Sequence, residues 1–388
     1  MNRKLLLTSL AVIAPLAIGV VNARPASAVD DVRYTLWMAT TGVPQWSDIQ
    51  ASAGKDAVVV LNADRQWQAE ALRRADPTVQ LYQYRDLASV RSYDSSRAVV
   101  AGVSYQQAQQ QDWLARDTNW NTIEWRPHPG HWQAKVWNPG YQDAWANGVS
   151  AQTRWPWNGV WADNDMTTLS WYTPALLAGT SSRGQTDQQI QGGVDAVIAK
   201  GGRALNNRGQ SMNVNISEGR LNHGRWWSHS RFGGGTAEHF MNWSRDGGTA
   251  DVWADRYGTW LNEAKLVEMG PRTLAITTAA SWDKQNCIFG YTSFLMFASP
   301  GDAWQCAPDG RYDRRWSFPE TDHRLGSPNG PAQQQGGAWV RSFQGGWVAV
   351  NPTLEWVSVW APSGTRSLDG QGLRQVWLAP TTGVVTKR

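Results

Sequence analysis

The sequence predicts a (β/α)₈ TIM barrel followed by a small antiparallel β domain. Strand-like and helix-like segments alternate about eight times across residues 29–330, which is typical of parallel strands joined by helical crossovers. After Pro331 the pattern changes to apolar–polar alternation with turns and no intervening helices. We find neither a glycine-rich dinucleotide fingerprint nor a phosphate loop. We therefore expect a barrel over residues 29–330 and a β appendage over 331–388.

The first 28 residues predict a secretory signal peptide. Arg3 and Lys4 precede the largely apolar stretch Leu5–Val21, and Ala26-Ser27-Ala28 is a small-residue cleavage site. No later stretch is long and apolar enough to span a bilayer. We expect cleavage after Ala28 and a secreted protein without stable membrane insertion.

The charge gives no support for a nucleic-acid partner. The 36 Lys and Arg of the chain fall to 33 when Arg3, Lys4 and Arg24 are removed with the leader, against 32 Asp and Glu. The mature protein is thus nearly neutral, and basic patches are what nucleic acids require. We expect a monomer of one large barrel with its appendage. Cys287 and Cys306 fit one disulfide in an exported protein.

The barrel elements follow from periodicity and from turn residues. Asp56–Asn62 is β-branched and strand-like, and the helix predicted at Gln66–Asp76 ends before Pro77. Apolar residues at helical spacing in Thr186–Lys200 predict a helix capped by Gly201-Gly202. The other predicted strands are Tyr34–Met38, Val79–Tyr84, a strand from Gly159, Met212–Ile216, Glu238–Trp243 after a Gly233–Gly235 loop, Arg272–Thr278 and a short one near Ala303-Trp304; the other helices are Tyr105–Arg116, Tyr141–Ser150 and Tyr291–Ala298.

Two further regions have distinct patterns. Asn119–Trp137 contains several Trp, Pro and Gly residues with little periodicity, and long loops of this kind are often functional. Its His128 and His131 could donate protons or bind a ligand, although loop histidines are more often simply solvated. In the appendage, the predicted antiparallel strands are Ala338–Phe343, Trp347–Val350, Glu355–Trp360 and Gln375–Leu378.

The stretch Asn158–Asp165 places two carboxylates after a short apolar run. Val160–Ala162 reads as a buried strand, and Asp163 and Asp165 follow it. Barrel enzymes build their active sites at the C-terminal ends of the strands. The alternative is a solvated Asp-rich loop, since Asp is common in turns.

Cleavage of a glycosidic bond needs two converging carboxyl groups. Asp163 and Glu238, on alternate strands, can meet across one barrel mouth, with Asp163 as nucleophile or base and Glu238 as general acid. Asp165 would orient substrate or raise a neighbour's pKa by like-charge repulsion, and whether Asp163 or Asp165 is catalytic stays open. Glu218 is a reserve acid. A carboxyl separation of about 5–5.5 Å would predict retention and about 6.5–9.5 Å inversion.

The 26 tryptophans suit a surface that is partly apolar and partly wet, as a sugar ring requires. We expect most to fill the core and a minority to line a groove. The candidate substrate contacts lie near predicted strand ends or among these aromatic residues: Trp37, Asn62, Tyr84, Arg85, Asp86, Trp137, Trp161, Asn215, Glu218, Trp243, Trp282 and Trp304.

Two other functions use the same residues. A non-catalytic glycan-binding protein would need the tryptophans but no paired acids. A metal-dependent polysaccharide esterase or lyase could use Asp163 and Asp165 as oxygen ligands, but no third ligand is evident and no Cys/His spacing suggests zinc. We expect no metal and no cofactor. No G-x-S-x-G motif indicates a serine hydrolase.

The chain resembles the hypothetical glycosyl hydrolase-like family 15. The resemblance is carried by Asn138–Trp145, by Gly159–Asp163, by Glu238, by Tyr291–Ala298 and by Trp339–Thr353, which is similar to the family's R-x-F-x-x-G-x-V-x-V-N-P-T ending. It implies a barrel that acts on a polysaccharide or oligosaccharide. The sequence departs from the family pattern at Asp163-Asn164-Asp165, where the family has adjacent acids.

Overall fold

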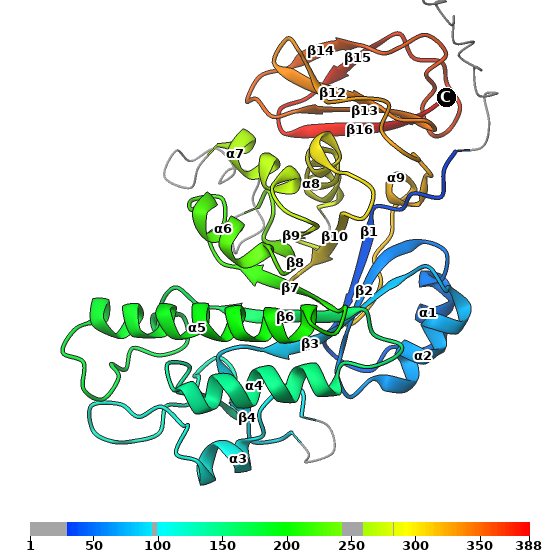
Figure 1. The fold of residues 1–388 in the computed structure, drawn as a ribbon. Coiled ribbons are helices and arrows are strands. Elements are labelled where there is room, and N and C mark those ends of the chain that lie inside the picture. The colour runs from blue at the N-terminus through cyan, green and yellow to red at the C-terminus, as the bar shows by residue number, and fades with distance from the viewer. Residues whose placement is uncertain (1–28, 95–98, 243–258, 282) are drawn as a thin grey trace, which may run out of the picture.

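The computed structural model describes residues 29–94, 99–242, 259–281 and 283–388. The predicted signal peptide lies outside these residues. Eight parallel strands close into a barrel in the order β1-β10-β9-β8-β7-β6-β3-β2 (Figure 1), which confirms the predicted fold class. The barrel strands are β1 (Thr35–Ala39), β2 (Asp56–Asn62), β3 (Gln80–Asp86), β6 (Gly159–Asp165), β7 (Ser211–Ile216), β8 (Gly233–Glu238), β9 (Thr273–Ala279) and β10 (Ala303–Pro308).

The strands alternate between the barrel interior and the surrounding helices. In β2, Val58 and Val60 belong to the interior cluster with Leu36 and Trp161, whereas Val59 and Leu61 pack outward in the cluster that includes residues of the first two helices. Successive strand residues point to opposite faces, so both faces of a parallel strand are buried and apolar. The helices are α1 (Trp46–Ser52), α2 (Gln66–Ala75), α3 (Tyr105–Gln110), α4 (Pro139–Gln152), α5 (Arg183–Asn206), α6 (His223–Ser230), α7 (Trp260–Ala264), α8 (Lys284–Phe297) and α9 (Pro319–Asp322), with 3₁₀ turns η1 (Leu169–Trp171) and η4 (Lys265–Glu268).

The sixth barrel strand is earlier than predicted. The sequence suggested a loop at Gly233–Gly235 and a strand from Glu238, but β8 begins at Gly233 and ends at Glu238. The glycines are needed because neighbouring strands approach closely: a Cβ on Gly233 would lie 2.4 Å from the Ser211 Cβ, and one on Gly234 would lie 2.5 Å from the Arg272 carbonyl oxygen. Glu238 therefore stands at the C-terminal end of its strand.

The predicted cap at Gly201-Gly202 is also wrong, because α5 continues to Asn206. A Cβ on Gly201 would lie 2.3 Å from the Trp145 ring of α4, and one on Gly202 would lie 2.3 Å from the Phe232 ring. These glycines serve close packing within the helix, although glycine inside a helix ordinarily costs about 1 kcal/mol relative to alanine.

The segment between β3 and α4 forms one wall of the molecule beside the barrel. Two short antiparallel strands, β4 (Ser89–Arg91) and β5 (His131–Gln133), pair within it. The sequence predicted a helix over Tyr105–Arg116, but the observed helix α3 is shorter and ends at Gln110. The structure thus gives partial order to the Trp-rich stretch that the sequence left as a loop.

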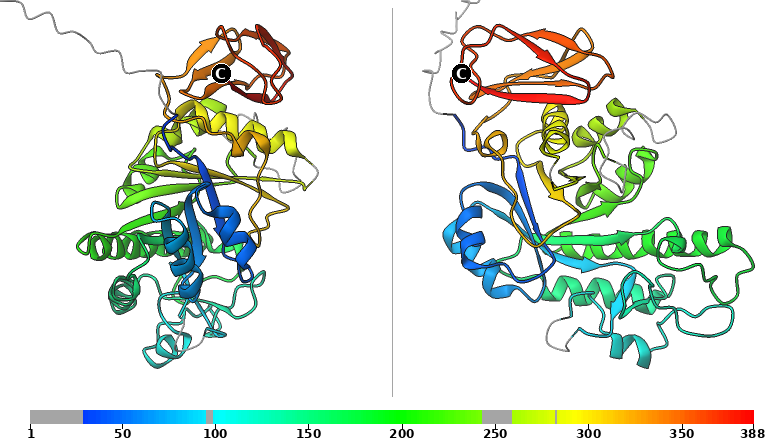
Figure 2. Two further views of the ribbon diagram at one scale, coloured as in Figure 1. Left: turned by 90° about the vertical axis from the view of Figure 1, so that its right-hand side faces the viewer. Right: turned by 180° about the vertical axis from the view of Figure 1, so that it is seen from behind.

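The C-terminal domain lies at one end of the molecule, against α8 (Figures 1 and 2). The sheet that packs on α8 has the order β11-β12-β13-β16, and β14 and β15 form a separate pair. Four strands match predicted ones; β11 and β16 were missed. The six strands are β11 (Gln333–Gln335), β12 (Ala338–Ser342), β13 (Gly346–Asn351), β14 (Val357–Trp360), β15 (Gln375–Leu378) and β16 (Thr382–Lys387).

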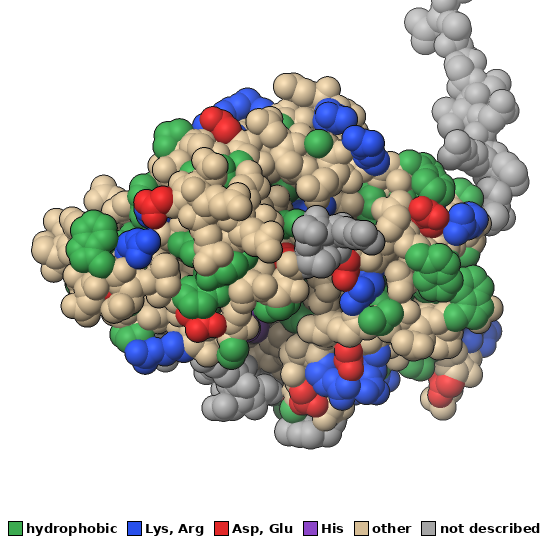
Figure 3. All heavy atoms as spheres, turned by 90° about the horizontal axis from the view of Figure 1, so that it is seen from below, with side chains coloured by type: hydrophobic (Ala, Val, Ile, Leu, Met, Phe, Trp, Pro, Cys, Tyr) green, Lys and Arg blue, Asp and Glu red, His purple; other side chains and the backbone are tan. Residues whose placement is uncertain are grey.

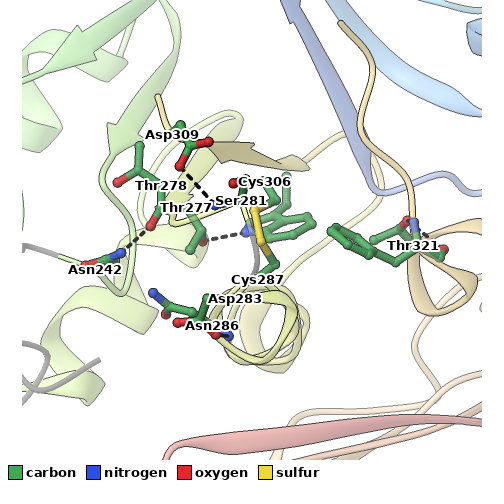
Figure 4. Close-up of a disulfide and its surroundings, with 12 residues drawn as sticks. Asn242, Thr277, Thr278, Ser281, Asp283, Asn286, Cys287, Cys306, Asp309 and Thr321 are labelled. Carbon is green, nitrogen blue, oxygen red and sulfur yellow. Dashed lines mark hydrogen bonds between the residues drawn. A yellow bond between two sulfur atoms is a disulfide. The ribbon is translucent and has the colours of Figure 1, made fainter. Parts of the chain in front are cut away.

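Cys287 and Cys306 form the predicted disulfide. It joins α8 to β10, so the helix under the C-terminal domain is bonded directly to a barrel strand (Figure 4). Within the described ranges, no helix has the length and apolar character needed to cross a membrane.

The face of the molecule seen from below carries side chains of both charges (Figure 3). Lys and Arg, Asp and Glu, and apolar side chains are interspersed on the face seen from below (Figure 3). Among the described residues on this face, cationic and anionic side chains alternate and form no broad cationic stripe.

Candidate active site

A cavity of about 1110 Å³ opens at the C-terminal ends of the barrel strands. Asp163 of β6, Asn215 of β7 and Glu238 of β8 line it. These are neighbouring strands, and in a parallel barrel their C-terminal ends share one mouth. The wall is completed by the β3–α4 segment, which contributes residues such as Trp125 and His131.

One amide links the two acids at the centre of this cavity. Asn215 Nδ2 donates hydrogen bonds to Asp163 Oδ1 at 2.9 Å and to Glu238 Oε2 at 2.7 Å. Tyr84 Oη donates to Asp163 Oδ2 at 2.6 Å, and Tyr312 Oη donates to Glu238 Oε1 at 2.6 Å. Each carboxyl oxygen thus meets a neutral donor, and the structure brings Asp163 and Glu238 together.

The pair has no cationic partner among these contacts, and this shifts its titration. Burial and the Glu238 charge raise the pKa of Asp163 to about 6, although hydrogen bonds from Tyr84 and Asn215 oppose the rise. Two close carboxylates in a poorly hydrated site disfavour double ionisation. Asp163 can therefore hold a proton in the mildly acidic range.

Near the C-terminal ends of three successive barrel strands, β6, β7 and β8, one residue adopts the left-handed backbone conformation. The φ angles are +67° at Asn164, +55° at Glu218 and +60° at His239. Such conformations cost non-glycine residues free energy and concentrate at functional sites. Asn164 is further fixed because its Oδ1 accepts a 2.6 Å hydrogen bond from Tyr172 Oη.

Asp165 also lines the cavity, but it has partners that Asp163 lacks. Its carboxylate is fully buried and forms ion pairs with Arg225 and His229 of α6. The charges that raise the pKa of Asp163 are those of Glu238 and Asp86. The ion pairs of Asp165 thus connect β6 with α6, and Asp163 is the acid that shares an amide donor with Glu238.

Asp165, Asp195 and His229 also have the spacing of a metal-ligand set. However, Arg225 donates hydrogen bonds to Asp165 and to Asp195, the latter at 3.3 Å. A guanidinium already neutralises these carboxylates and would repel a metal cation. The donor set fits an ion-pair network better than a metal site.

The predicted substrate contacts divide into two groups. Tyr84, Trp161, Asn215 and Glu218 line the cavity. The others that the structure describes do not line it. Asp86 is buried and accepts hydrogen bonds from Ser89, Arg85 donates to Gln83, and the side chains of Trp37 and Trp304 are enclosed in the core. Asn62 donates to the Thr40 carbonyl and Trp137 packs against the core. Trp243 and Trp282 lie outside the described residues.

Several cavity residues were not singled out from the sequence. Tyr312 could have been found only by extending the last strand, since β10 continues to Pro308 and the loop after it carries Tyr312. Arg91, Tyr93, Trp171 and Tyr172 come from the two loops after β3 and β6, whose folding no periodic pattern reveals.

Of the two loop histidines, His131 is the better defined. Its Nε2 lies 2.6 Å from Tyr93 Oη and its Nδ1 lies 3.2 Å from Ser89 Oγ. Burial lowers the pKa of His131 to about 4. The neutral form of the ring is therefore favoured near pH 7.

An eight-stranded parallel barrel with two carboxyl groups converging at its C-terminal mouth defines a TIM-barrel glycoside hydrolase. The sequence model of the family described as hypothetical glycosyl hydrolase family 15 matches residues 73–347, and the chain belongs to that family.

Similar solved structures include several proteins that act on carbohydrates. The glycoside hydrolase domain of PelA from Pseudomonas aeruginosa is 11% identical with a TM-score of 0.44, over 72% of this chain and 96% of that one. Aspergillus fumigatus Ega3, in complex with galactosamine, is 9% identical with a TM-score of 0.43, over 74% and 95%. A Flavobacterium johnsoniae dextranase is 12% identical with a TM-score of 0.49, over 92% and 51%. No curated protein sequence matches the chain.

Proposed function

We propose that the chain hydrolyses a glycosidic bond with retention of anomeric configuration, with Asp163 as nucleophile and Glu238 as general acid and base. The observation that carries this proposal is the shared amide of Asn215. One nitrogen lies 2.9 Å from Asp163 Oδ1 and 2.7 Å from Glu238 Oε2. These oxygens are therefore less than about 6 Å apart, near the spacing of about 5–5.5 Å in retaining enzymes and short of the 6.5–9.5 Å or so that inversion needs.

The hydrogen bonds support Asp163 as the nucleophile. Its carboxylate accepts from Tyr84, from Asn215 and from the Asn164 backbone N–H at 2.9 Å. These donors fix both oxygens in place and stabilise the ionised form. Burial opposes ionisation of Asp163, so its negative charge is poorly hydrated. Attack on the anomeric carbon removes this charge, which favours the reaction.

In the first step, protonated Glu238 gives its proton to the glycosidic oxygen as the bond from that oxygen to the anomeric carbon breaks. Asp163 attacks the same carbon from the opposite face and forms a glycosyl ester. In the second step, Glu238 takes a proton from water, the water oxygen bonds to the anomeric carbon, and Asp163 leaves as a carboxylate. Two inversions give net retention.

The substrate in this proposal is a polysaccharide or a long oligosaccharide. The cavity is large, and exposed aromatic side chains stand in its wall, with Trp171 at 40% and Tyr93 at 60% exposure. Such rings can stack on the apolar faces of sugars beyond the cleaved bond. A carbohydrate substrate also follows from the family.

We also propose that the protein is exported as a monomer after removal of residues 1–28. The charged start, apolar stretch and Ala26-Ser27-Ala28 support this, as does a disulfide, which persists in oxidising compartments. N-terminal sequencing of protein from the culture medium, with Val29 as the expected first residue, tests export. Sedimentation of the purified protein tests the monomer.

Chemical rescue tests the two roles separately. After a polysaccharide panel has identified a substrate, Asp163→Gly and Glu238→Ala are assayed on an activated aryl glycoside with added azide. In Asp163→Gly, azide replaces the nucleophile, and the glycosyl azide should have inverted configuration. In Glu238→Ala the glycosyl ester still forms, so the azide product should have retained configuration. The opposite pair of products would exchange the two roles, and full activity of either variant without azide would refute both.

A further inference from the structure

Three strongly exposed tryptophans lie together on the C-terminal domain, and none of them lines the cavity of the barrel. Trp356, Trp360 and Trp377 are 64%, 60% and 63% exposed. Tryptophan is usually among the more buried residue types. Three at this exposure on one pair of strands therefore need an explanation.

The strand register places all three rings on one face. In the β14–β15 pair, Ser358 is opposite Trp377 and Trp360 is opposite Gln375. Trp356 precedes β14 by one residue. Because residues two apart in a strand share a face, the same side carries Trp356, Ser358 and Trp360. Trp377 thus stands between Trp356 and Trp360 at diagonal positions, about 7–8 Å from each. We call these residues the tryptophan row.

The opposite face of the same strands is closed. Val359 and Leu378 are buried and pack with Trp347 of β13. The domain contacts the barrel through the other sheet, because α8 packs on β13 and β16. In Figures 1 and 2 β14 and β15 lie on the side of the domain away from α8. The tryptophan row therefore faces outward and is rigidly supported from below.

We propose that the tryptophan row binds an extended, uncharged polysaccharide chain as a site separate from the catalytic cavity. Indole faces stack on the apolar C–H faces of sugar rings, and Trp356 to Trp360 covers about 13 Å of strand, enough to contact more than one ring. The remaining outward positions are Ser358 and Gln375, which supply neutral hydrogen-bonding groups at the edges of the rings. The face carries no charge at these positions, which complements a neutral glycan.

Other occupants fit this surface less well. Peripheral membrane surfaces combine aromatic residues with Lys and Arg that attract anionic headgroups, and the outward positions of the row have neither. A second protein chain would need about 800 Å² per partner. Three indoles at roughly 60% exposure offer on the order of 450 Å², which is the size of a small functional patch.

Binding to insoluble glycans tests the site. Asp163→Asn is used as the parent so that the ligand is not degraded, and it is sedimented with microcrystalline cellulose, chitin or insoluble β-1,3-glucan. We expect binding to at least one of these, and at least a tenfold weaker association in W356A/W360A/W377A. W67A/W120A/W227A is the matched control, because it removes three tryptophans of similar exposure from scattered positions, and it should bind like the parent. Trp377→Ala alone, at the centre of the row, should show part of the loss.

Three results would overturn the proposal: no binding by the parent, equal binding by the row variant, or equal loss in the scattered control. The row variant could instead keep glycan binding but lose binding to lipid vesicles, or lose self-association in sedimentation. Either result would overturn the proposal, because the first would assign the tryptophan row to a membrane and the second to another copy of the chain.

The inference rests on the proposed function only in assuming that the protein meets polysaccharide. With Asp163 restored, the row variant should hydrolyse a small soluble glycoside at the parental rate. If Asp163→Asn were fully active while the row variant still lost binding, the proposed catalytic roles would fail and the binding site would stand.

Discussion

Asp163 and Asp165 lie two residues apart in one strand, yet their surroundings are opposite. Asp163 faces another acid across the cavity, and within the described residues its hydrogen-bond donors are neutral: Tyr84, Asn215 and the Asn164 backbone. Asp165 is buried against Arg225 and His229. An acid left without a cation keeps a titratable proton and can react, whereas a paired acid contributes to structure. The charge of the neighbouring groups, more than the residue type, therefore distinguishes the proposed nucleophile from the ion-paired acid.

The largest expected effect is on activity at the unpaired acid. Asp163→Asn and Glu238→Gln should each lower kcat by about 10²–10⁴-fold or more, because either change removes one half of the carboxyl pair. The fold should remain intact, as judged by circular dichroism. Release of reducing ends from the identified substrate measures the loss, and parental rates in either variant would contradict the assignment.

Asp163→Asn should also stabilise the folded protein at neutral pH, whereas substitution of Asp165 should destabilise it. The pKa of Asp163 is raised to about 6 in the folded state. A raised carboxyl pKa gives a contribution that is fully present below the unfolded pKa and is lost as the pH rises through about 6. Above that pH the buried charge is a cost. Asp163→Asn should therefore raise the melting temperature at pH 7.5 but not near pH 4, and an equal rise at both would be inconsistent.

Asp165→Asn should have the opposite effects: it should lower the free energy of unfolding and leave the catalytic rate nearly unchanged. Removing one member of a buried ion pair costs about 3–5 kcal/mol, because the remaining charges stay buried. Here Arg225 and His229 would be left with Asp195. Urea denaturation measures the loss. Asp195→Asn is the matched control, since it removes a carboxyl with the same two partners whose side chain is 51% exposed, and it should cost about 1 kcal/mol or less.

A smaller effect is expected from the donors to Asp163. If Asp163 must be ionised to attack, kcat/KM should rise with pH through about 6 on the acidic side of the profile. Tyr84→Phe removes a hydrogen bond that lowers the pKa of Asp163, so this limb should move to higher pH. Tyr312→Phe, on Glu238, serves as the comparison. A limb in which activity falls above pH 6 would instead make Asp163 the proton donor.

The sequence could predict the barrel and the two acids, because both follow from strand ends. It could not choose between Asp163 and Asp165. In a regular strand, residues two apart point to the same side, and both acids do line the cavity. They differ in their partners, because only Asp165 forms ion pairs with α6. The deciding partner, Arg225, comes from a helix 60 residues further along the chain.

Other features depended on close packing, which a residue pattern does not show. Glycine runs usually indicate turns or caps, but Gly233–Gly235 lie within β8 and Gly201 lies within α5. In both places the neighbouring atoms leave no room for a Cβ. Tyr312 was missed for a related reason, since its loop has no periodicity and is defined only by where β10 ends.

The position of α8 determines how the C-terminal domain can be used. Arg341 of β12 donates hydrogen bonds to the Leu295 and Ala298 carbonyl oxygens at the end of this helix, and Gly383 of β16 lies directly against Thr292. The C-terminal domain is therefore packed directly on the barrel and is not connected to it by a flexible linker alone. The tryptophan row therefore keeps a constant distance and orientation relative to the cavity. A polysaccharide fibre bound to the row would be cleaved only at bonds that this fixed geometry allows to enter the cavity.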